Sequence, residues 1–184
     1  RSVLDRMTAP LEHMLRNAVV HGIEEPKARA RQGKPEEGEI TVTVEAEATE
    51  FVVRVEDDGN GVNLEAVRNR AIERGMITRK EDVPEARLLN FILESGFSTA
   101  TTVTGLAGRG VGMDVVSNEV KQIGGSMEIR SVPGKGTCFT LRIPFSLART
   151  PPSSPFFATL ALDANSYLNY PEYWRRTAPR TPAT

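Results

Sequence analysis

A glycine-rich stretch that runs into an apolar helical pattern is the part of this sequence best suited to hold a ligand. It covers residues 105–116, with glycines at positions 108, 110 and 112. Glycine lets the backbone approach a ligand closely, and exposed N–H groups in front of a helix N-terminus form a site for phosphate. The stretch therefore favours a nucleotide ligand, although the same spacing on its own also fits a plain turn.

Three polar residues recur at every fourth position of an otherwise apolar helical pattern. They are His13, Asn17 and His21, and apolar residues such as Met14 and Leu15 lie between them. A spacing of four advances about 40° around an α-helix, so the three side chains point to one neighbouring face. This stripe is a candidate site, and a solvent-facing polar stripe is the alternative.

An acidic pair followed by glycines ends a predicted strand. The run is Asp57-Asp58-Gly59-Asn60-Gly61. A carboxylate at this place can accept a hydrogen bond from the exocyclic amine of a base, and the glycines leave room for the ring. A tight turn is the alternative interpretation, because aspartate and glycine are common turn residues.

The elements that must position these residues follow from periodicity. Pro10 suits the first turn of a helix and Gly22 its end, so we predict a helix at about residues 10–21. Residues 24–38 predict a loop or a short irregular helix. Two strand pairs with interspersed helices predict a sheet with helices on one face. The predicted strands lie at 40–45, 51–56, around 127–129 and at 139–143, and the helices at 64–74 (capped by Asn63), 84–94 and 113–123.

Composition excludes several classes of protein. The chain has 184 residues, 39% of them hydrophobic, so it can bury one core. Its formal net charge is −1 and it has no long basic run, which argues against a nucleic-acid partner. A single cysteine argues against a disulfide framework. With no apolar run of membrane-spanning length and no signal-peptide pattern, we expect a cytoplasmic protein without direct membrane insertion.

Four short motifs, in order, resemble the four boxes of the GHKL ATP-binding fold. The runs around Asn17 and His21 and at residues 96–99 and 108–116 resemble the CheA-type chemotaxis histidine kinases in particular, including their type IV pilus chemosensory relatives. The resemblance covers residues 3–148 and implies an α+β Bergerat fold: a two-layer sandwich with a mixed, mostly antiparallel sheet and helices on one face. The motifs are Asn17 in a helix, Asp57-x-Gly59-x-Gly61 after a strand, Gly96-Phe97, and Gly108-x-Gly110-x-Gly112 opening a helix.

The resemblance implies roles by position, with ATP and Mg²⁺ as cofactors. Mg²⁺ bridging the ATP phosphates would be ligated by Asn17, and the adenine amino group would be read by Asp57, with the glycines after it against the base. His13 and His21 would lie near the triphosphate. Gly59 and Gly61 are the glycines that follow Asp57, and Arg70 on the next helix would contact a phosphate. The other implied nucleotide contacts are Ser98, Thr99 and Leu106 of an ATP lid, and Gly108, Arg109, Gly110, Val111 and Gly112 of the phosphate loop.

The position four residues before Asn17 separates the branches of this superfamily. The ATP-hydrolysing branches carry a water-activating glutamate there, whereas this chain has His13, and Glu12 points about 100° away. The resemblance therefore implies transfer of the γ-phosphoryl group to a histidine on a separate phosphotransfer domain, then to a response regulator. A coupling protein and chemoreceptor array would act through domains outside this chain. A nucleotide-binding module without turnover and an ATP hydrolase are the alternatives.

Several features depart from the family pattern. Val20 stands where aspartate is usual, which favours a degenerate module. Ser95 stands where proline is usual, which should loosen the entry to the lid. Family domains carry a further strand and helix before the asparagine helix, so we expect an N-terminally truncated domain at residues 1–148. Residues 149–184 contain every tyrosine and the only tryptophan, and many prolines. We predict a disordered or non-native tail there, with a partner-binding segment around residues 167–174 as the alternative.

Overall fold

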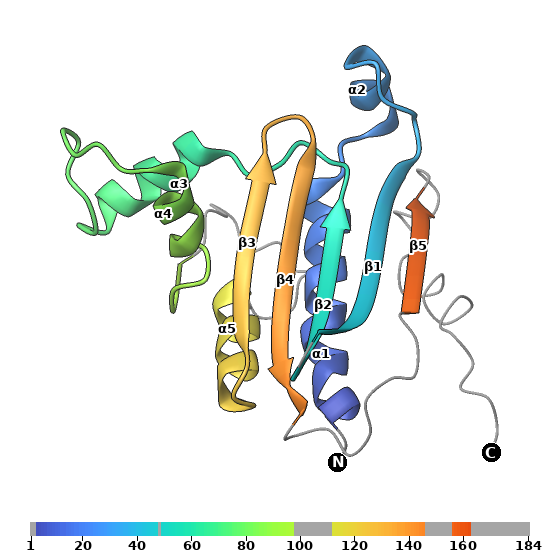
Figure 1. Ribbon diagram of the computed structural model, residues 1–184. Coiled ribbons are helices and arrows are strands. Elements are labelled where there is room, and N and C mark those ends of the chain that lie inside the picture. Colours follow the sequence, from blue (N-terminus) through green and yellow to red (C-terminus); the bar gives the residue numbers. More distant parts are fainter. Residues whose placement is uncertain (1–2, 48, 98–111, 146–155, 163–184) are drawn as a thin grey trace, which may run out of the picture.

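The computed structural model describes residues 3–47, 49–97, 112–145 and 156–162, with the backbone alone for 3–6 and 156–162. Its centre is one sheet of five strands in the order β3-β4-β2-β1-β5 (Figure 1). All four pairings of neighbouring strands are antiparallel, so these strands lack the parallel component of the expected mixed sheet. The strands are β1 (Gly38–Glu47), β2 (Glu50–Asp57), β3 (Ser126–Val132), β4 (Gly136–Pro144) and β5 (Phe156–Leu162).

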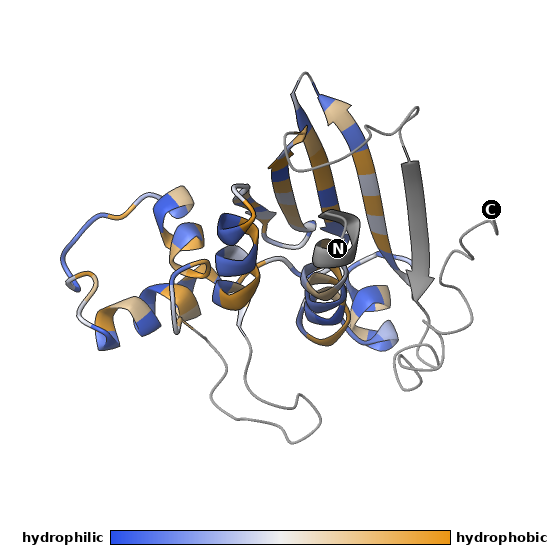
Figure 2. Cartoon of the chain, turned by 90° about the horizontal axis from the view of Figure 1, so that it is seen from below, coloured by the Kyte–Doolittle hydropathy of each residue, from blue (hydrophilic) through white to orange (hydrophobic). Residues whose placement is uncertain are grey.

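Both strand pairs predicted from alternating residues form hairpins. β1 pairs with β2, β3 pairs with β4, and the two hairpins join through β2 and β4. Hydrophobic and hydrophilic residues alternate along the strands, as Figure 2 shows, because successive side chains of a strand point to opposite faces. The strand residues that are buried in the main core are the apolar members of this alternation: Ile40, Phe51, Val53, Val55, Ile129, Phe139, Leu141 and Ile143.

Two helices cover one face of the sheet and form the second layer. They are α1 (Val3–Asn17) and α5 (Met113–Gln122), which lie side by side behind the strands in Figure 1. Each buries an apolar stripe in the core shared with the sheet, for example Met14 of α1 and Val120 of α5. The two-layer α+β arrangement expected from the sequence is therefore confirmed.

The first helix begins earlier than its sequence predicts. α1 starts at Val3, and Pro10 lies in its interior rather than in its first turn. Proline inside a helix removes one backbone hydrogen bond. The ring of Pro10 is fully buried, and its burial offsets part of that cost.

The end of the first helix also differs from expectation. After Asn17 the chain continues as a π-helix, η1 (Ala18–Gly22), in which the Ile23 N–H donates to the Ala18 carbonyl at 2.8 Å. A π turn holds more residues than an α turn. The four-residue spacing that aligns His13 with Asn17 therefore does not carry over unchanged to His21.

Three shorter helices lie outside the central layers. α2 (Pro26–Arg31) is the irregular segment before β1, while α3 (Leu64–Glu73) and α4 (Glu85–Phe91) pack together to one side of the sheet (Figure 1). The predicted cap is confirmed, since the Asn63 side chain accepts a hydrogen bond from the Ala66 N–H at 2.9 Å. Among the described residues, no helix has the length and apolar character needed to cross a bilayer. A second core under α3 and α4 contains Val67, Ala71, Ile77, Val83, Leu88, Phe91 and Phe97.

The fifth strand lies inside the segment predicted to be a disordered or non-native tail. β5 pairs with the outer edge of β1, from Gly38 opposite Leu162 to Val44 opposite Phe156. The strand has no proline and no charge, and pairing satisfies backbone groups that an open edge leaves without partners. Residues 156–162 thus form a paired strand within the predicted tail, and the division of the chain at residue 148 stays a prediction.

Candidate functional site

Asp57 ends β2 near the centre of the sheet, and its side chain is buried. The residue is 5% exposed. Its Oδ1 accepts hydrogen bonds from the N–H of Gly59 at 3.0 Å and from the N–H of Thr137 at 3.3 Å. Because Thr137 belongs to β4, the acidic turn predicted from the sequence also joins the two hairpins.

Three glycines allow the backbone to close around this aspartate. A Cβ atom at Gly22 would lie 3.0 Å from the Asp57 carboxylate, and one at Gly59 would lie 2.0 Å from the Gly22 carbonyl oxygen. At Gly136, where φ is 112°, a Cβ atom would lie 1.8 Å from the Asp57 carbonyl oxygen. The end of η1, the turn after β2 and the start of β4 therefore meet at one carboxylate only because these positions lack side chains.

The electrostatic state of Asp57 suits it to accept a hydrogen bond from a ligand. Burial raises its pKa from 3.8 to about 6, against the two backbone N–H groups, which lower it. The neighbouring carboxylates of Asp58 and Glu24 raise this pKa further. The ion pairs of the described residues do not include Asp57. At pH 7 it is mostly ionised, and since both described hydrogen bonds use Oδ1, Oδ2 is the oxygen available to a donor.

The polar residues of the first helix lie on the segment that ends at the Asp57 turn. Asn17 is half-buried at the junction of α1 and η1, and its side chain makes no capping hydrogen bond to the π turn. His13 is half-buried one turn earlier, and His21 is exposed. The residue after His21, Gly22, accepts a hydrogen bond from the Asn60 N–H at 3.0 Å, which fixes the end of η1 against the Asp57 turn.

The donor set near Asn17 determines which metal could bind. The described residues contain no group of three or more His, Cys, Asp or Glu side chains placed to hold a metal ion. A cation at the Asn17 amide oxygen would therefore take its other ligands from phosphate oxygens and water. Mg²⁺ accepts this arrangement, because it prefers oxygen ligands and keeps several waters.

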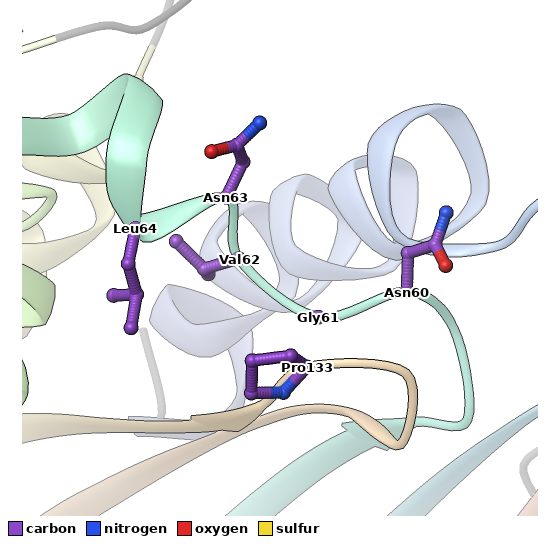
Figure 3. A pocket seen from close by; sticks show the side chains of 6 residues that line it. All are labelled: Asn60, Gly61, Val62, Asn63, Leu64 and Pro133. Carbon is purple, nitrogen blue, oxygen red and sulfur yellow. The ribbon is translucent and has the colours of Figure 1, made fainter. Parts of the chain in front are cut away.

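Gly61 lies in the chain segment that leads from β2 to α3. Its φ is 75°, and a Cβ atom there would lie 2.7 Å from the Val132 carbonyl oxygen. A pocket of about 360 Å³ opens beside it, between this segment and the turn that joins β3 to β4 (Figure 3). Neither Asp57 nor Asn17 lines this pocket. It shares with the candidate base site only the turn after β2, through Asn60 and Gly61. The lining residues are Asn60, Gly61, Val62, Asn63, Leu64 and Pro133.

The remaining predicted contacts lie partly outside the described residues. Arg70 on α3 forms an ion pair with Glu73 of the same helix, with 2.9 Å between Nη1 and Oε2. Gly112 is the N-cap of α5. Near it the Gly96 N–H donates to Asp114 Oδ2 at 2.7 Å, so two predicted motifs lie together. The predicted contacts Ser98, Thr99, Leu106, Gly108, Arg109, Gly110 and Val111 fall outside the described residues.

Four residues that build this site are not indicated by the sequence. Gly136 belongs to a run that predicts only a turn and Thr137 to the strand after it, and the hydrogen bond from Thr137 to Asp57 joins residues 80 positions apart. Arg29 and Lys34 belong to the charged segment predicted as a loop or a short irregular helix, and nothing in that prediction indicates that Arg29 is fully buried. The spacing of apolar residues gives no signal for the contact of Thr137 or for the burial of Arg29. Gly134 and Gly136, which precede Thr137, do resemble the other glycine motifs of the chain.

Comparison with known proteins assigns a family. Residues 7–147 match the family described as histidine kinase-, DNA gyrase B- and HSP90-like ATPase. The chain is 43% identical over 150 residues to the chemotaxis protein CheA of Halobacterium salinarum, covering 80% of this chain and 22% of that protein. It is 40% identical over 148 residues to CheA of Rhizobium meliloti, covering 80% and 20%. The gliding motility regulatory protein of Myxococcus xanthus is 41% identical over 150 residues, with 80% and 19% covered. The chain thus spans about a fifth of the length of these relatives.

Proposed function

Because the chain belongs to the family of histidine kinase-, DNA gyrase B- and HSP90-like ATPases, we propose that residues 1–148 are the ATP-binding domain of a CheA-like histidine kinase. The proposed reaction transfers the γ-phosphoryl group of Mg-ATP to a histidine on a separate phosphotransfer domain. A response regulator would then receive the group. The names of the relatives, a chemotaxis protein and a gliding motility regulatory protein, support a role in motility signalling.

The buried carboxylate of Asp57 is the observation that carries this proposal. It is 5% exposed, it lies among glycines, and both described hydrogen bonds to it come from backbone groups. Such a carboxylate can accept a hydrogen bond from the adenine amine. The space beside Gly59 and Gly61 is filled by the backbone of Gly22 and Val132, so these glycines fix the turn that presents the carboxylate, and they do not leave the room for the ring that the sequence suggested. The inferred contact explains why an ionisable group lies buried with no ion pair to the part of the chain that the structure describes.

The helix that ends at this turn supplies the proposed groups for the phosphates. The amide oxygen of Asn17 would ligate Mg²⁺, which when bound neutralises charge on the phosphate oxygens. His13 and His21 would lie beside the triphosphate and orient it. Backbone N–H groups of residues 108–112 would bind the phosphates in front of α5.

The residue four positions before Asn17 favours transfer of the phosphoryl group to a protein acceptor over hydrolysis. His13 occupies the place from which a carboxylate activates water in the hydrolytic branches of the fold. Without that base, catalysis would rest on positioning and charge neutralisation, as is general for phosphoryl transfer. Both histidines of this chain lie on the helix assigned to the triphosphate. The acceptor would therefore belong to another domain or protein, and a coupling protein would act through further domains.

Calorimetry on the whole chain tests the nucleotide site. A non-hydrolysable ATP analogue is titrated with and without Mg²⁺ into the wild-type chain and into Asp57→Asn. We expect binding that requires Asp57 and is much weaker without the metal. Binding of equal strength in the variant would contradict the proposed base contact.

A transfer assay with labelled ATP tests the reaction. We expect label on an added phosphotransfer domain and none on this chain. Label on the chain itself, retained after both histidines are replaced, would contradict the assignment of the acceptor. Steady ATP hydrolysis without an acceptor would support the hydrolase instead.

A binding module without turnover is the second candidate. Val20 in the π turn after Asn17 is 44% exposed, where family members usually carry an aspartate, so a polar group is absent next to the proposed triphosphate site. If the chain binds ATP without transferring phosphate, and Val20→Asp restores transfer, the valine at this position is the cause of the missing activity.

A further inference from the structure

Arg29 is a fully buried cation in the short helix α2. Its side chain is 0% exposed, although α2 and its flanking residues lie outside the central layers. All three guanidinium nitrogens donate hydrogen bonds. The acceptors are the carbonyl of Pro35 (2.8 Å), Glu24 Oε2 (3.0 Å), the carbonyl of Glu37 (3.2 Å), Asp58 Oδ2 (2.7 Å) and the carbonyl of Asp58 (3.4 Å).

Lys34 extends the same cluster toward the turn after β2. Its Nζ donates to Glu24 Oε1 at 2.7 Å and to the carbonyls of Asp58 and Gly59, each at 2.8 Å. Glu24 thus accepts from both cations, and its side chain is 3% exposed. Burial alone would raise the pKa of Glu24, but the hydrogen bonds from Lys34 and Arg29 lower it, so the carboxylate stays ionised.

The cluster and Asp57 hold the same short segment from opposite sides. The N–H of Gly59 donates to Asp57 Oδ1, while its carbonyl accepts from Lys34. Asp58 is fixed through both its side chain and its carbonyl, and its Oδ1 also accepts from the Glu39 N–H at 2.9 Å. The backbone around Asp57 therefore has little freedom to rotate.

We propose that Arg29 and Lys34 are positioning residues for the base-binding carboxylate of Asp57. They fix the peptide groups of Asp58 and Gly59, and so hold the direction in which Oδ2 of Asp57 faces a ligand. This inference rests on the proposed nucleotide site and adds a set of residues that never touch the nucleotide.

A merely stabilising role is the competing explanation. Buried ion pairs contribute little net stability against apolar residues of similar size, because desolvation opposes their attraction. Removing one partner is costly for stability even so, and therefore loss of stability does not separate the two roles. The preference for a ligand that carries the adenine amine does separate them, because this preference depends on where Oδ2 of Asp57 lies.

The experiment compares ATP with inosine triphosphate, which has a carbonyl oxygen in place of the exocyclic amine. Calorimetry on the whole chain with Mg²⁺ gives both dissociation constants for wild type, Lys34→Met, Arg29→Lys and the control Lys27→Met, an exposed position on α2. Lys34 is the decisive variant, because its side chain is 17% exposed whereas that of Arg29 is 0% exposed, so its replacement removes less buried structure. Arg29→Lys keeps the charge but loses the planar fork of donors.

We expect wild type and Lys27→Met to prefer ATP, and Lys34→Met to lose about tenfold of that preference. The affinity of Lys34→Met for inosine triphosphate should change less than its affinity for ATP. An unchanged preference in a folded Lys34→Met would overturn the positioning role while leaving the nucleotide site intact. No preference for ATP in wild type would instead refute the proposed base contact itself. Loss of preference in folded Arg29→Lys would extend the role to the guanidinium.

Discussion

Replacing Asp57 with asparagine should stabilise the unliganded protein and strongly weaken its affinity for ATP. Asparagine has nearly the same shape, and its single carbonyl oxygen can accept both backbone hydrogen bonds that now go to Oδ1. The substitution therefore preserves the turn and removes the charge. It also places an N–H₂ group where the second carboxylate oxygen lies.

The gain in stability follows from the raised pKa. Folding shifts the pKa of Asp57 from 3.8 to about 6, and such a shift corresponds to about 3 kcal/mol. Because the folded pKa is the higher one, the native state binds more protons between pH 4 and pH 6. Stability from this group is present below pH 4 and is lost as the pH rises through 6. The variant cannot ionise, so it should exceed wild type by up to about 3 kcal/mol at pH 7.5 and match it near pH 3.5.

The loss of affinity follows from hydrogen-bond polarity. The asparagine amide would meet the adenine amine donor to donor, and a charge-assisted hydrogen bond would be lost. We expect ATP affinity to fall at least about 100-fold. Wild-type affinity should also fall as the pH drops below 6, because the protonated carboxyl no longer accepts fully.

Urea unfolding at both pH values and calorimetry with Mg²⁺ and an ATP analogue measure the two effects on the same samples. A variant less stable than wild type at pH 7.5 would show that the carboxylate stabilises its own turn. A variant that binds ATP as wild type does would refute the base contact. The opposite signs of the two effects are the signature of a carboxylate kept ionised for a ligand.

Three further predictions concern other parts of the molecule. Gly136→Ala should lower the free energy of unfolding by at least about 2 kcal/mol, because its φ is 112° and its Cβ would lie 1.8 Å from a backbone oxygen. Gly134→Ala shares a positive φ of 75° but has nothing within 4 Å of the added Cβ, so it is the control that isolates the clash and should lose less stability; equal losses in urea unfolding would contradict this reasoning. Asn17→Ala should weaken Mg-ATP binding about tenfold but leave metal-free binding unchanged, with exposed Asn118→Ala as the control in calorimetry; a loss independent of Mg²⁺ would argue against metal ligation. Removal of residues 149–184 should leave the outer edge of β1 open and cause self-association in sedimentation, and a monomer of unchanged stability would show that β5 contributes nothing.

The elements that were predictable from sequence are those set by local pattern. The strands of both hairpins alternate apolar and polar residues, and Asn63 is a side chain that caps the helix following it. Helix ends were less predictable, because burial of Pro10 outweighs its local preference for a first turn. The π turn after Asn17 has no counterpart in a 3.6-residue period.

The site was predictable as a set of motifs but not as an assembly. Asp57 and its glycines attract attention because a strand runs straight into them. Thr137 does not, because its contact with Asp57 depends on how β4 lies beside β2. Burial of Arg29 likewise depends on acceptors from three segments, at Glu24, at residues 35–37 and at Asp58, whereas its sequence neighbours predict only a loop or a short irregular helix.

The pairing of β2 with β4 has a consequence for protein synthesis. A ribosome that has released the chain only through Phe97 has released β1, β2 and the helices α3 and α4. The Asp57 turn then still lacks Thr137 and Gly136, which close it from β4. The pairing of distant strands must follow later, and such pairings form slowly. Unfinished chains would therefore leave cellular ATP unbound, and the first nucleotide taken up would mark a nearly complete domain.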